Sequence, residues 1–434
     1  MEQVRIFKRR LLCACLLVLA AMAAAENALP RVRLTPSSIA GKLAAAAEPL
    51  SLELFTEGAL LLSGAEVEEL PDLNREIGNL VAEARSELGG IGSQEELAEE
   101  LLLYLHRRLL MTYREQQTRV DVLLREGSYN CVSSAVIYAV MAKAFSLQVE
   151  AVRTPDHAFC RVLIDSRAGE AIDVETTSPF GFDPGSRREF KDHFGRVTGY
   201  TYVPPQNAAG RRRAGEKELL ALILYNRSAF ASETGGYVRA LSPAVDAYAL
   251  LADGESRERL LVALSNLASY YGIERRYDEG TRFLRAALAR YGPEPSLSRL
   301  QADLLHNWAV ELIDAGDYAG ARSLLDRALS ASELSEPAWR PLAVYALQKQ
   351  AREASRRDYG QAAEVIREGL ERVGRVEELL QSYEAYAHNQ AAVLIRRGDL
   401  AEARRVLSEA LTVMPESRRL QSDVSRLEEL PEPG

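Results

Sequence analysis

Along residues 37–127 the apolar side chains recur every three or four positions, which is the spacing of one buried face on an α-helix. The segments that show this spacing are, in order, SIAGKLAAAA, LELFTEGALLLSG, LNREIGNLVAEARSELG and ELAEELLLYLHRRLLMTYR. Asp72 can cap the third helix, and Ser93 with Glu96 forms a capping box before the fourth. The pattern therefore predicts a helical region that ends near residue 127.

The next apolar segment, YNCVSSAVIYAVMAKAF, has almost no polar face. A helix that is apolar all round is buried, so we expect this one to lie at the centre of a small core. Ser128 or Asn130 can cap it, and either cap places Cys131 in the first turn.

Alternation of apolar and polar residues then replaces the helical period, which predicts strands. A first strand over residues 147–153 ends at Thr154 and Pro155, a second is HAFCRVLI, and the turn DSRAGE leads into a third, AIDVETT. A buried helix followed by an antiparallel meander is an α+β arrangement. His157 opens the second strand, and Cys160, three positions on, faces the opposite side of the sheet.

From residue 218 the sequence becomes periodic. Corresponding residues lie 40 or 41 positions apart, at Tyr237, Tyr277, Tyr318, Tyr359 and Leu400. Small residues follow three and ten positions later, where two helices would touch. An amide recurs in each preceding helix, at Asn226, Asn266, Asn307, Gln348 and Asn389, and we expect these amides to form hydrogen bonds between helices. The pattern predicts about five helix pairs over residues 218–430, stacked as an all-α solenoid.

The first 25 residues are typical of a secretory signal peptide. Basic residues precede the apolar run LLCACLLVLAAMAAA, and small residues stand before Glu26 at the expected cleavage site. The run is short for a membrane span, so we expect an exported, periplasmic protein with no span after cleavage. Lipid anchoring at Cys15 is a less favoured alternative.

Charge adds little to this picture. The net charge of the chain is −9, and the densest basic run, Arg211 to Arg213, falls in a predicted linker over residues 204–217. A nucleic-acid partner would need a clustered basic face, so none is expected. The sequence contains neither a metal-ligand cluster nor a glycine-rich phosphate loop, and we expect no metal and no cofactor.

Cleavage of the signal peptide leaves two cysteines, Cys131 and Cys160. In an oxidising compartment two cysteines either pair or stay reduced for a reason. The amides at a helix N-terminus stabilise a thiolate and can hold a developing oxyanion, so Cys131 is a candidate nucleophile. A Cys131–Cys160 disulfide and an inert buried thiol are the alternatives.

His157 is the candidate base, and Asp173 is the candidate carboxylate that orients it. A symmetric hairpin over residues 166–169 places Asp173 opposite Val162, about 16 Å along the strand from His157 at ~3.3 Å per residue. A bulge or an asymmetric turn is therefore needed, and Glu175 and Asp156 are alternative partners for the histidine.

Two other histidines have simpler interpretations. His193 lies in the segment FKDHFGRVTGY after the strands and is a second candidate for the base. His106 lies within a predicted helix with no ligand residue at helical spacing, so we interpret it as a half-buried structural histidine.

The order of Cys131 at a helix start, His157 in DHAF and Asp173 in IDVETT resembles the transglutaminase-like superfamily, which is related to papain-type cysteine peptidases. The segment FTEGALLLSGAEVEELPDLNREIGNLVAEA is similar to the helical lead-in of bacterial transglutaminase-like proteins that carry a tetratricopeptide tail. GDYAGARSLLDRALSASE and GDLAEARRVLSEALTVMPES resemble the second half of a tetratricopeptide repeat. The resemblance covers about residues 50–430.

The resemblance implies a transglutaminase-like domain over residues 30–203, with a helical prefix (30–127) and a catalytic core (128–203), before the tetratricopeptide-like repeats. Each repeat would carry about seven residues more than the usual 34, and we place these extra residues at the start of each first helix.

The resemblance also assigns roles to the site residues. It implies Cys131 as nucleophile, His157 as base and Asp173 as orienting carboxylate, in a cysteine acyl transferase or amide hydrolase that acts on protein or peptide amides. The repeats would bind a protein or peptide partner. The alternative function is a non-catalytic periplasmic adaptor whose solenoid binds protein partners.

Overall fold

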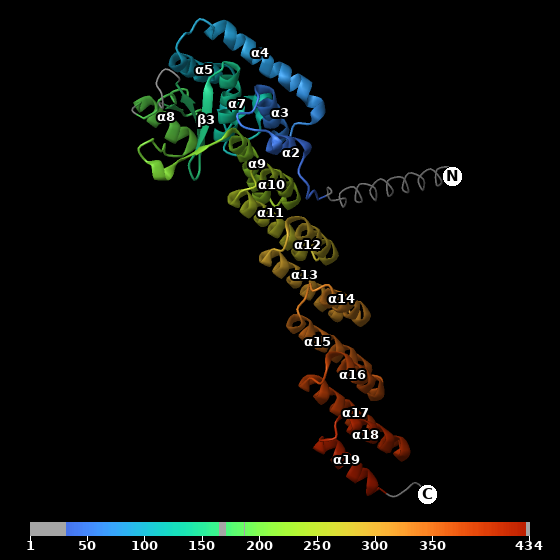
Figure 1. Cartoon of the computed structure of the whole chain (residues 1–434). Helices are drawn as coiled ribbons and strands as arrows, with labels where there is room; N and C mark the ends of the chain where they lie inside the picture. The colour runs from blue at the N-terminus through green and yellow to red at the C-terminus, as the bar shows by residue number, and fades with distance from the viewer. Residues whose placement is uncertain (1–31, 165–170, 186, 431–434) are drawn as a thin grey trace, which may run out of the picture. The chain divides into compact units, whose positions relative to one another are not determined.

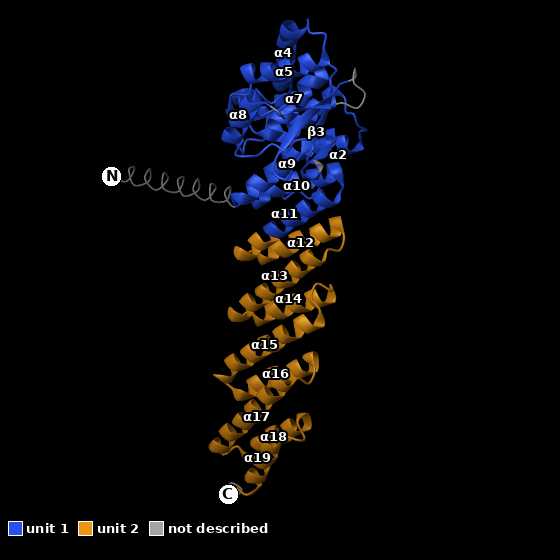
Figure 2. Ribbon diagram, turned by 90° about the vertical axis from the view of Figure 1, so that its left-hand side faces the viewer, with its two compact units in different colours: residues 1–267 blue, residues 268–434 orange. Residues whose placement is uncertain are grey.

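A computed structural model of the chain describes residues 32–164, 171–185 and 187–430. The predicted signal peptide and Cys15 lie outside the described residues. The chain divides into two compact units, one that ends at Leu267 and one that begins at Ala268 (Figure 2). Most of the described residues are helical, and the strands form two small sheets in the first unit.

The predicted N-terminal helices are present in the first unit (Figure 1). They are α2 (Ser38–Ala45), α3 (Leu52–Ser63), α4 (Leu70–Leu88), α5 (Gln94–Arg108) and α6 (Val120–Glu126). The Ser93 side chain caps α5 by accepting a hydrogen bond from the backbone N–H of Glu96, as predicted. The predicted cap of α4 is wrong, because the helix begins at Leu70 and Asp72 lies in its first turn.

The last residues of the predicted fourth helix form a strand instead. β1 (Thr112–Tyr113) pairs in parallel with β2 (Ser128–Tyr129), which ends two residues before Cys131. This pairing places Tyr113 beside Tyr129, with the two rings edge to face at 5.8 Å. Residues far apart in the sequence are thereby brought to the start of the next helix.

That helix, α7 (Cys131–Ala144), is the centre of the first unit. All of its residues except Lys143 are buried, which confirms the helix predicted to lack a polar face. It contacts α3, α5 and α9, and it also contacts the strands β3 and β4.

The four-stranded sheet has the order β5-β4-β3-β6, and every neighbouring pair is antiparallel. Its strands are β3 (Gln148–Arg153), β4 (Ala158–Leu163), β5 (Ala171–Val174) and β6 (Arg212–Ala214), with helix α8 (Arg188–Thr198) between the last two. The predicted meander is therefore present. The predicted linker over residues 204–217 is not a simple linker, because β6 lies within it and pairs with β3 along the edge of the sheet.

The register between β4 and β5 differs by one residue from that of a symmetric hairpin. Arg161 lies opposite Asp173, and Leu163 lies opposite Ala171, which leaves an odd number of connecting residues. A shift of one residue moves a side chain to the other face of a sheet. Asp173 therefore shares a face with Arg161 and His157, rather than with Val162.

Helices α9 (Glu216–Glu233) and α10 (Tyr237–Leu251) belong to the first unit, as does most of α11 (Gly254–Ile273). All seven residues from Leu219 to Tyr225 are buried, and α9 contacts α3 and α7. The sequence predicts that the repeats begin as a separate domain near residue 218. The compact unit instead extends past that point, because an apolar helix packs on the core.

The second unit consists of successive helices packed against one another (Figure 2). They are α12 (Tyr277–Tyr291), α13 (Pro295–Asp314), α14 (Tyr318–Ser330), α15 (Glu336–Ser355), α16 (Tyr359–Val373), α17 (Glu377–Arg397), α18 (Leu400–Val413) and α19 (Arg418–Glu428). The aligned positions of the sequence repeat are the first residues of α12, α14, α16 and α18. The small residues that follow them are buried at helix contacts. A Cβ on Gly369, for example, would lie 2.7 Å from the Leu347 side chain.

The helices that precede these aligned positions are the longer ones, with 20 residues in α13 and α15 and 21 in α17. Gln348 donates a hydrogen bond to the carbonyl of Glu378 on the next long helix, at 3.4 Å. Asn226 donates instead to the Thr118 hydroxyl in the loop before α6, at 3.2 Å.

None of the helices in the described part of the chain combines the length and apolar character that a membrane-spanning helix needs.

Candidate active site

Cys131 is the first residue of α7, and its position is set by the residue before it. Asn130 caps the helix, since its side-chain oxygen accepts hydrogen bonds from the backbone N–H groups of Val132 and Ser133, both at 3.0 Å. The Ser133 hydroxyl in turn accepts a hydrogen bond from the backbone N–H of Asn130 at 2.9 Å. This reciprocal capping box fixes the first turn on which the thiol is carried.

The cap changes the predicted oxyanion site. The N–H groups of Val132 and Ser133 are already bonded to Asn130, so they do not serve an incoming substrate. The backbone N–H of Cys131 itself is not used by the cap. This amide lies at the positive end of the helix and can donate to an oxyanion formed at the thiol.

His157 lies immediately before β4, at the end of the turn that follows β3. Its carbonyl accepts hydrogen bonds from the backbone N–H and the hydroxyl of Thr154, at 2.9 and 3.2 Å. Its ring lies between the ring of Phe194, at a centroid distance of 5.2 Å, and that of Tyr200, at 5.4 Å. The imidazole is buried and held by aromatic contacts on a turn with a fixed geometry.

The structure pairs His157 with Glu175 and not with Asp173. The Nε2 atom of His157 lies 2.8 Å from the Glu175 carboxylate, and both side chains are buried. Asp173 lies opposite Arg161. Because Arg161 is four residues from His157, Asp173 is about 13 Å from the histidine along the strand direction. Glu175 is two residues further along the chain on the same face of the sheet, and its carboxylate reaches the histidine. The sequence alternative Glu175 therefore replaces the predicted Asp173.

Glu175 is fixed by the segment that follows it. Its second carboxylate oxygen accepts hydrogen bonds from the backbone N–H of Thr177 at 3.2 Å and from the Thr177 hydroxyl at 2.8 Å. Its backbone N–H donates to the carbonyl of Gly181 at 2.8 Å. A Cβ on Gly181 would lie 1.9 Å from the Glu175 carbonyl oxygen, so this close approach requires glycine.

Residues 175–178 are fully buried, and α5 and α7 anchor them. The Nε2 atom of His106 on α5 lies 3.1 Å from the carbonyl oxygen of Thr176, and the Ser134 hydroxyl on α7 lies 2.8 Å from the Thr176 hydroxyl. Burial lowers the pKa of His106 to about 4. His106 is thus a half-buried histidine that supports the segment carrying Glu175.

Asp173 has a different role, as the buried partner of Arg211. The two side chains form a bidentate ion pair at 2.6 and 2.7 Å, and the Tyr202 hydroxyl donates to the same carboxylate. The guanidinium also lies 5.2 Å from the centre of the Phe159 ring. The sequence predicts a solvated linker for Arg211, and this is wrong, because the arginine side chain is buried in its ion pair with Asp173.

The electrostatics couple the thiol, the imidazole and the carboxylate. Burial opposes a charged imidazolium, but the Glu175 carboxylate and the Cys131 thiol outweigh it and raise the pKa of His157 to about 10. The Nδ1 atom of His157 is buried and has no hydrogen-bond partner of good geometry among the described residues. One ring nitrogen therefore bonds to Glu175, and the other is available to the thiol.

Tyr113 is a further polar group near the thiol that the sequence did not indicate. Burial, and next the charge of a Cys131 thiolate, raise the pKa of Tyr113 well above its ordinary value. The phenol therefore stays protonated and remains a hydrogen-bond donor. The parallel pairing of β1 with β2, which brings Tyr113 to this position, leaves no pattern in the sequence.

Comparison of this chain with the models of known protein families and with curated proteins finds no match. The chemistry of the site therefore rests on its own geometry.

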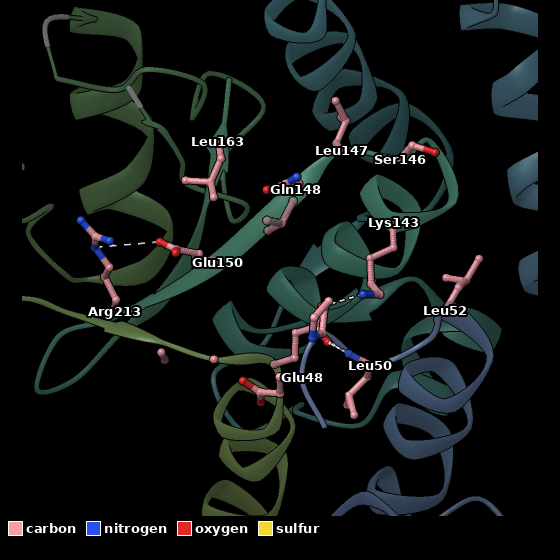
Figure 3. Close-up of a pocket in the computed structure, with 15 residues that line it drawn as sticks. Glu48, Leu50, Leu52, Lys143, Ser146, Leu147, Gln148, Glu150, Leu163 and Arg213 are labelled. Carbon is pink, nitrogen blue, oxygen red and sulfur yellow. Dashed lines mark hydrogen bonds and ion pairs between the residues drawn. The ribbon is translucent and has the colours of Figure 1, made fainter. Parts of the chain in front are cut away.

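Cys131 and His157 line a common pocket with a volume of about 240 Å³. Its walls come from β1, the turn before β4, the segment around Tyr200, and the helices α9 and α11. A larger pocket of about 740 Å³ lies at the opposite end of β3, where Leu50, Lys143 and Glu150 line it, and it contains neither Cys131 nor His157 (Figure 3). We therefore place the candidate site in the smaller pocket.

The remaining predicted residues are not part of the Cys131–His157 pair. Cys131 and Cys160 are both free thiols, and Cys160 donates a weak hydrogen bond to the Ala135 carbonyl at 3.3 Å on the α7 side of the sheet. His193 lies on α8 with its ring against Phe180, and it is absent from the lining of the pocket. Asp156 does line the pocket but is exposed.

Proposed function

We propose that this protein is a cysteine-dependent acyl transferase or amide hydrolase of the transglutaminase-like and papain-like type, acting on protein or peptide amides. The observation that carries the proposal is the arrangement of three buried groups. A thiol at the start of α7 faces an imidazole, and the imidazole bonds to the Glu175 carboxylate at 2.8 Å. Nucleophile, base and orienting carboxylate in this order are the components of covalent acyl transfer.

Because the pKa of His157 is raised to about 10, the imidazole carries a proton before the substrate binds. The Cys131 thiol therefore gives its proton to His157 in the resting protein, and in the first step the thiolate sulfur attacks the carbonyl carbon of the amide. Glu175 stabilises the imidazolium that forms and holds its ring in place. The developing oxyanion would accept a hydrogen bond from the Cys131 backbone N–H, and the Tyr113 hydroxyl is a second donor near the thiol.

The tetrahedral intermediate then collapses. The C–N bond breaks, the imidazolium returns its proton to the leaving amine, and a thioester to Cys131 remains. In the second half-reaction His157 removes a proton from water or from an amine, which attacks the thioester and releases the thiol. Water gives hydrolysis, and an amine gives transamidation.

The reactivity of Cys131 with iodoacetamide near pH 6 tests this proposal. We expect rapid alkylation of Cys131 in the folded protein and slow alkylation when His157 is replaced by glutamine. Cys160 is an internal control in the same chain, because burial raises the pKa of its thiol. Peptide mass spectrometry separates the two sites. Alkylation of Cys131 only after unfolding would refute the catalytic proposal.

We also propose that the helix pairs of the second unit are tetratricopeptide-like and bind a protein or peptide. A groove of about 860 Å³ between α16, α17 and α18 supports this proposal. Arg367, Tyr383 and Arg405 line it, and each arginine is flanked by glutamates on its own helix. The groove is also the observation that favours the alternative function, a periplasmic adaptor without catalysis.

The two functions differ in what they require of Cys131. An adaptor keeps its partner when Cys131 is replaced by serine and loses it when Tyr383 is replaced by alanine. For the enzyme, replacement of Cys131 abolishes acyl transfer, whereas replacement of Tyr383 leaves the alkylation rate of Cys131 unchanged. Measuring partner binding on both variants, and Cys131 alkylation on the Tyr383 variant, separates these cases.

A further inference from the structure

One wall of the candidate active site is formed by residues of α9 and α11, helices that the sequence assigns to the repeats. Tyr225 on α9 and Arg259 on α11 line the same pocket as Cys131 and His157, and so does Arg153 at the end of β3. These residues all belong to the first compact unit. The mechanism proposed for Cys131, His157 and Glu175 assigns no function to this wall.

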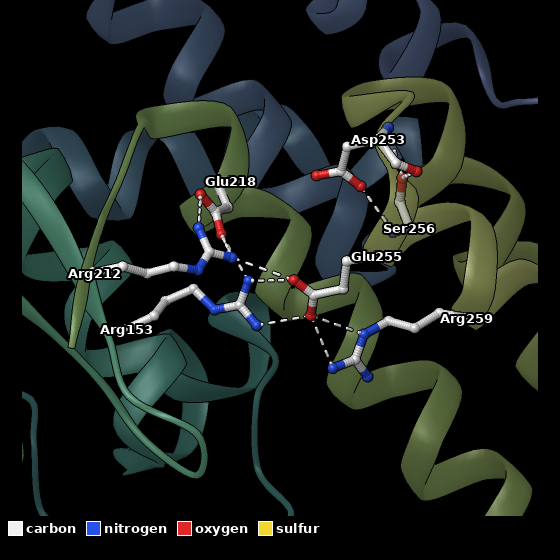
Figure 4. A network of polar contacts seen from close by, with 7 residues as sticks. All are labelled: Arg153, Arg212, Glu218, Asp253, Glu255, Ser256 and Arg259. Carbon is white, nitrogen blue, oxygen red and sulfur yellow. Dashed lines mark hydrogen bonds and ion pairs between the residues drawn. The ribbon is translucent and has the colours of Figure 1, made fainter. Parts of the chain in front are cut away.

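Three arginines and two glutamates form a network of ion pairs at this wall, with Asp253 nearby (Figure 4). Arg153 bonds to Glu218 at 2.6 Å and to Glu255 at 2.9 Å, and Arg212 contacts both glutamates. Arg259 bonds to Glu255 at 3.0 Å. Hydrogen bonding, above all to Arg153, lowers the pKa of Glu255 to about 2, so it stays ionised. Three guanidinium groups thus share two carboxylates.

Arg259 is the more exposed of the two arginines of the network that line this pocket. Its side chain is 45% exposed, whereas that of Arg153 is 13% exposed. Glu255 occupies its Nε and Nη2 atoms, and its Nη1 atom has no hydrogen bond within the described part of the chain. An arginine with one free edge at a pocket is suited to a planar carboxylate.

Tyr225 supplies a second donor without an acceptor. The Arg259 guanidinium lies over its ring at 4.4 Å. Tyr225 is 4% exposed, and its hydroxyl has no hydrogen-bond partner among the described residues. A buried hydroxyl without a partner is unfavourable, and an incoming oxygen acceptor would satisfy it.

The side of the pocket near Tyr200 is acidic. Glu115 accepts a hydrogen bond from the Tyr200 hydroxyl at 3.0 Å, and the charges that raise the pKa of Tyr200, after burial, include those of Glu115 and Asp156. The charges around Tyr225 are of both signs, those of Glu255 and Asp253 and those of Arg259 and Arg153. The guanidinium groups of this pocket therefore lie near Tyr225 and not near Tyr200.

We propose that Arg259 and Tyr225 form a subsite that binds a carboxylate of the substrate, so that the preferred substrates are amides with a carboxylate near the bond that reacts. The inference rests on the proposed function of Cys131. The carboxylate is either an acidic side chain or the C-terminus of a peptide, since both present the same group to the guanidinium.

The test uses a matched pair of alkylating reagents, N-iodoacetyl-β-alanine and N-iodoacetyl-β-alaninamide, which differ by one carboxylate. The rate of the anionic reagent is divided by the rate of the neutral reagent, for Cys131 in the full chain and for N-acetylcysteine. Dividing the first ratio by the second removes the difference in intrinsic reactivity between the two reagents. We expect a preference for the anionic reagent, and we expect Arg259→Gln to reduce it about tenfold, as the loss of one charge-assisted contact would. Tyr225→Phe should reduce it to a smaller extent.

The control is Arg188→Gln, which removes the same charge from a side chain on α8 that is 92% exposed and does not line the pocket. It should leave the ratio unchanged. A circular dichroism melt of Arg259→Gln that matches the melt of the natural chain shows that the variant is folded. Arg259→Lys retains the charge and should retain most of the preference.

Two results distinguish failure of the proposed function from failure of the carboxylate subsite. If neither reagent alkylates Cys131 in the natural chain, the proposed function fails. If both react but the ratio is the same in the natural chain and in Arg259→Gln, the carboxylate subsite is refuted while the nucleophile stands.

Protection experiments then identify the source of the carboxylate. The peptides acetyl-Ala-Ala, acetyl-Ala-Glu-amide and acetyl-Ala-Gln-amide are added as competitors of iodoacetamide. Protection by the first indicates a terminal carboxylate, and protection by the second indicates an acidic side chain. Equal protection by all three would overturn the subsite.

Discussion

Asp173 and Glu175, two carboxylates that lie two residues apart, have different partners at the end of β5. Asp173 holds Arg211 in a buried bidentate pair, and Glu175 holds His157. Both lie on the same face by strand alternation, so the residue type alone does not distinguish them. Their distances from His157 along the sheet decide which one can orient it.

Substitution of each carboxylate by its amide separates these roles. Glu175→Gln should slow alkylation of Cys131 near pH 6 by about 100-fold, because the imidazolium loses its partner. Asp173→Asn should leave alkylation unchanged and lower the free energy of unfolding by about 3 kcal/mol, because Arg211 keeps a buried charge without its counterion. Iodoacetamide kinetics and urea unfolding measure the two effects. The reverse pattern would restore Asp173 as the orienting residue.

The raised pKa of His157 also predicts how stability depends on pH. The pKa is 6.5 for an ordinary histidine and about 10 in the folded protein, so the folded state binds the proton more tightly. The resulting stabilisation is fully present below pH 6.5 and is lost as the pH rises through 10. The free energy of unfolding should therefore fall over this interval.

Comparison with His157→Gln isolates the contribution of His157 to the pH dependence of the unfolding free energy. We expect the difference in unfolding free energy between the natural chain and this variant to shrink from pH 6.5 to pH 10. A constant difference over that range would show that the folded pKa is not raised.

At the scale of elements, the site depends on how the chain turns after β5. Glu175, Thr177 and Gly181 form a compact turn in which the backbone of Gly181 lies against the carbonyl of Glu175. α5 and α7 anchor the same segment through His106 and Ser134. The orientation of the histidine thus depends on contacts made several residues away from it.

Replacing Gly181 by alanine should disturb this turn. The added Cβ would lie 1.9 Å from the Glu175 carbonyl oxygen, so the backbone must move. We expect a loss of about 1–3 kcal/mol in unfolding free energy, together with slower alkylation of Cys131. Gly185→Ala is the matched control, because a Cβ there meets no atom within 4 Å. Equal effects of the two substitutions would contradict the proposed support of Glu175.

At the scale of the whole molecule, the unit that contains the candidate active site includes helices that follow the sequence repeat. α9 buries the residues from Leu219 to Tyr225 against the core, and Tyr225 then lines the candidate active site. The repeat period therefore begins inside the first compact unit, and the end of the predicted transglutaminase-like domain at residue 203 does not coincide with the end of that unit.

This boundary can be tested by truncation. A chain that ends at residue 203 should not unfold cooperatively, since loss of α9 exposes apolar surface on α3 and α7. A chain that ends at Ile273, after α11, should melt cooperatively and keep the alkylation rate of Cys131. Circular dichroism melts and iodoacetamide kinetics measure both properties. Cooperative melting of the shorter chain would show that α9 is dispensable.

Features set by local spacing could be predicted from the sequence. The absence of a polar face predicts the buried helix α7, and strand alternation places Cys160 away from His157. The repeat of aromatic and small residues predicts helix pairs, and its aligned positions are the first residues of α12, α14, α16 and α18. Each of these features depends on side chains a few positions apart, whose periodicity is visible in the chain itself.

Features set by contacts between distant segments required the tertiary structure. An odd number of residues connects β4 and β5, which is consistent with the observed register. This register allows Glu175, and not Asp173, to reach His157. The pairing of β6 with β3 holds Arg211 where its side chain reaches Asp173 on β5, and the packing of α9 brings Tyr225 to the pocket that Cys131 lines. Such pairings are chosen by the burial of surfaces far apart in sequence, so no local period records them.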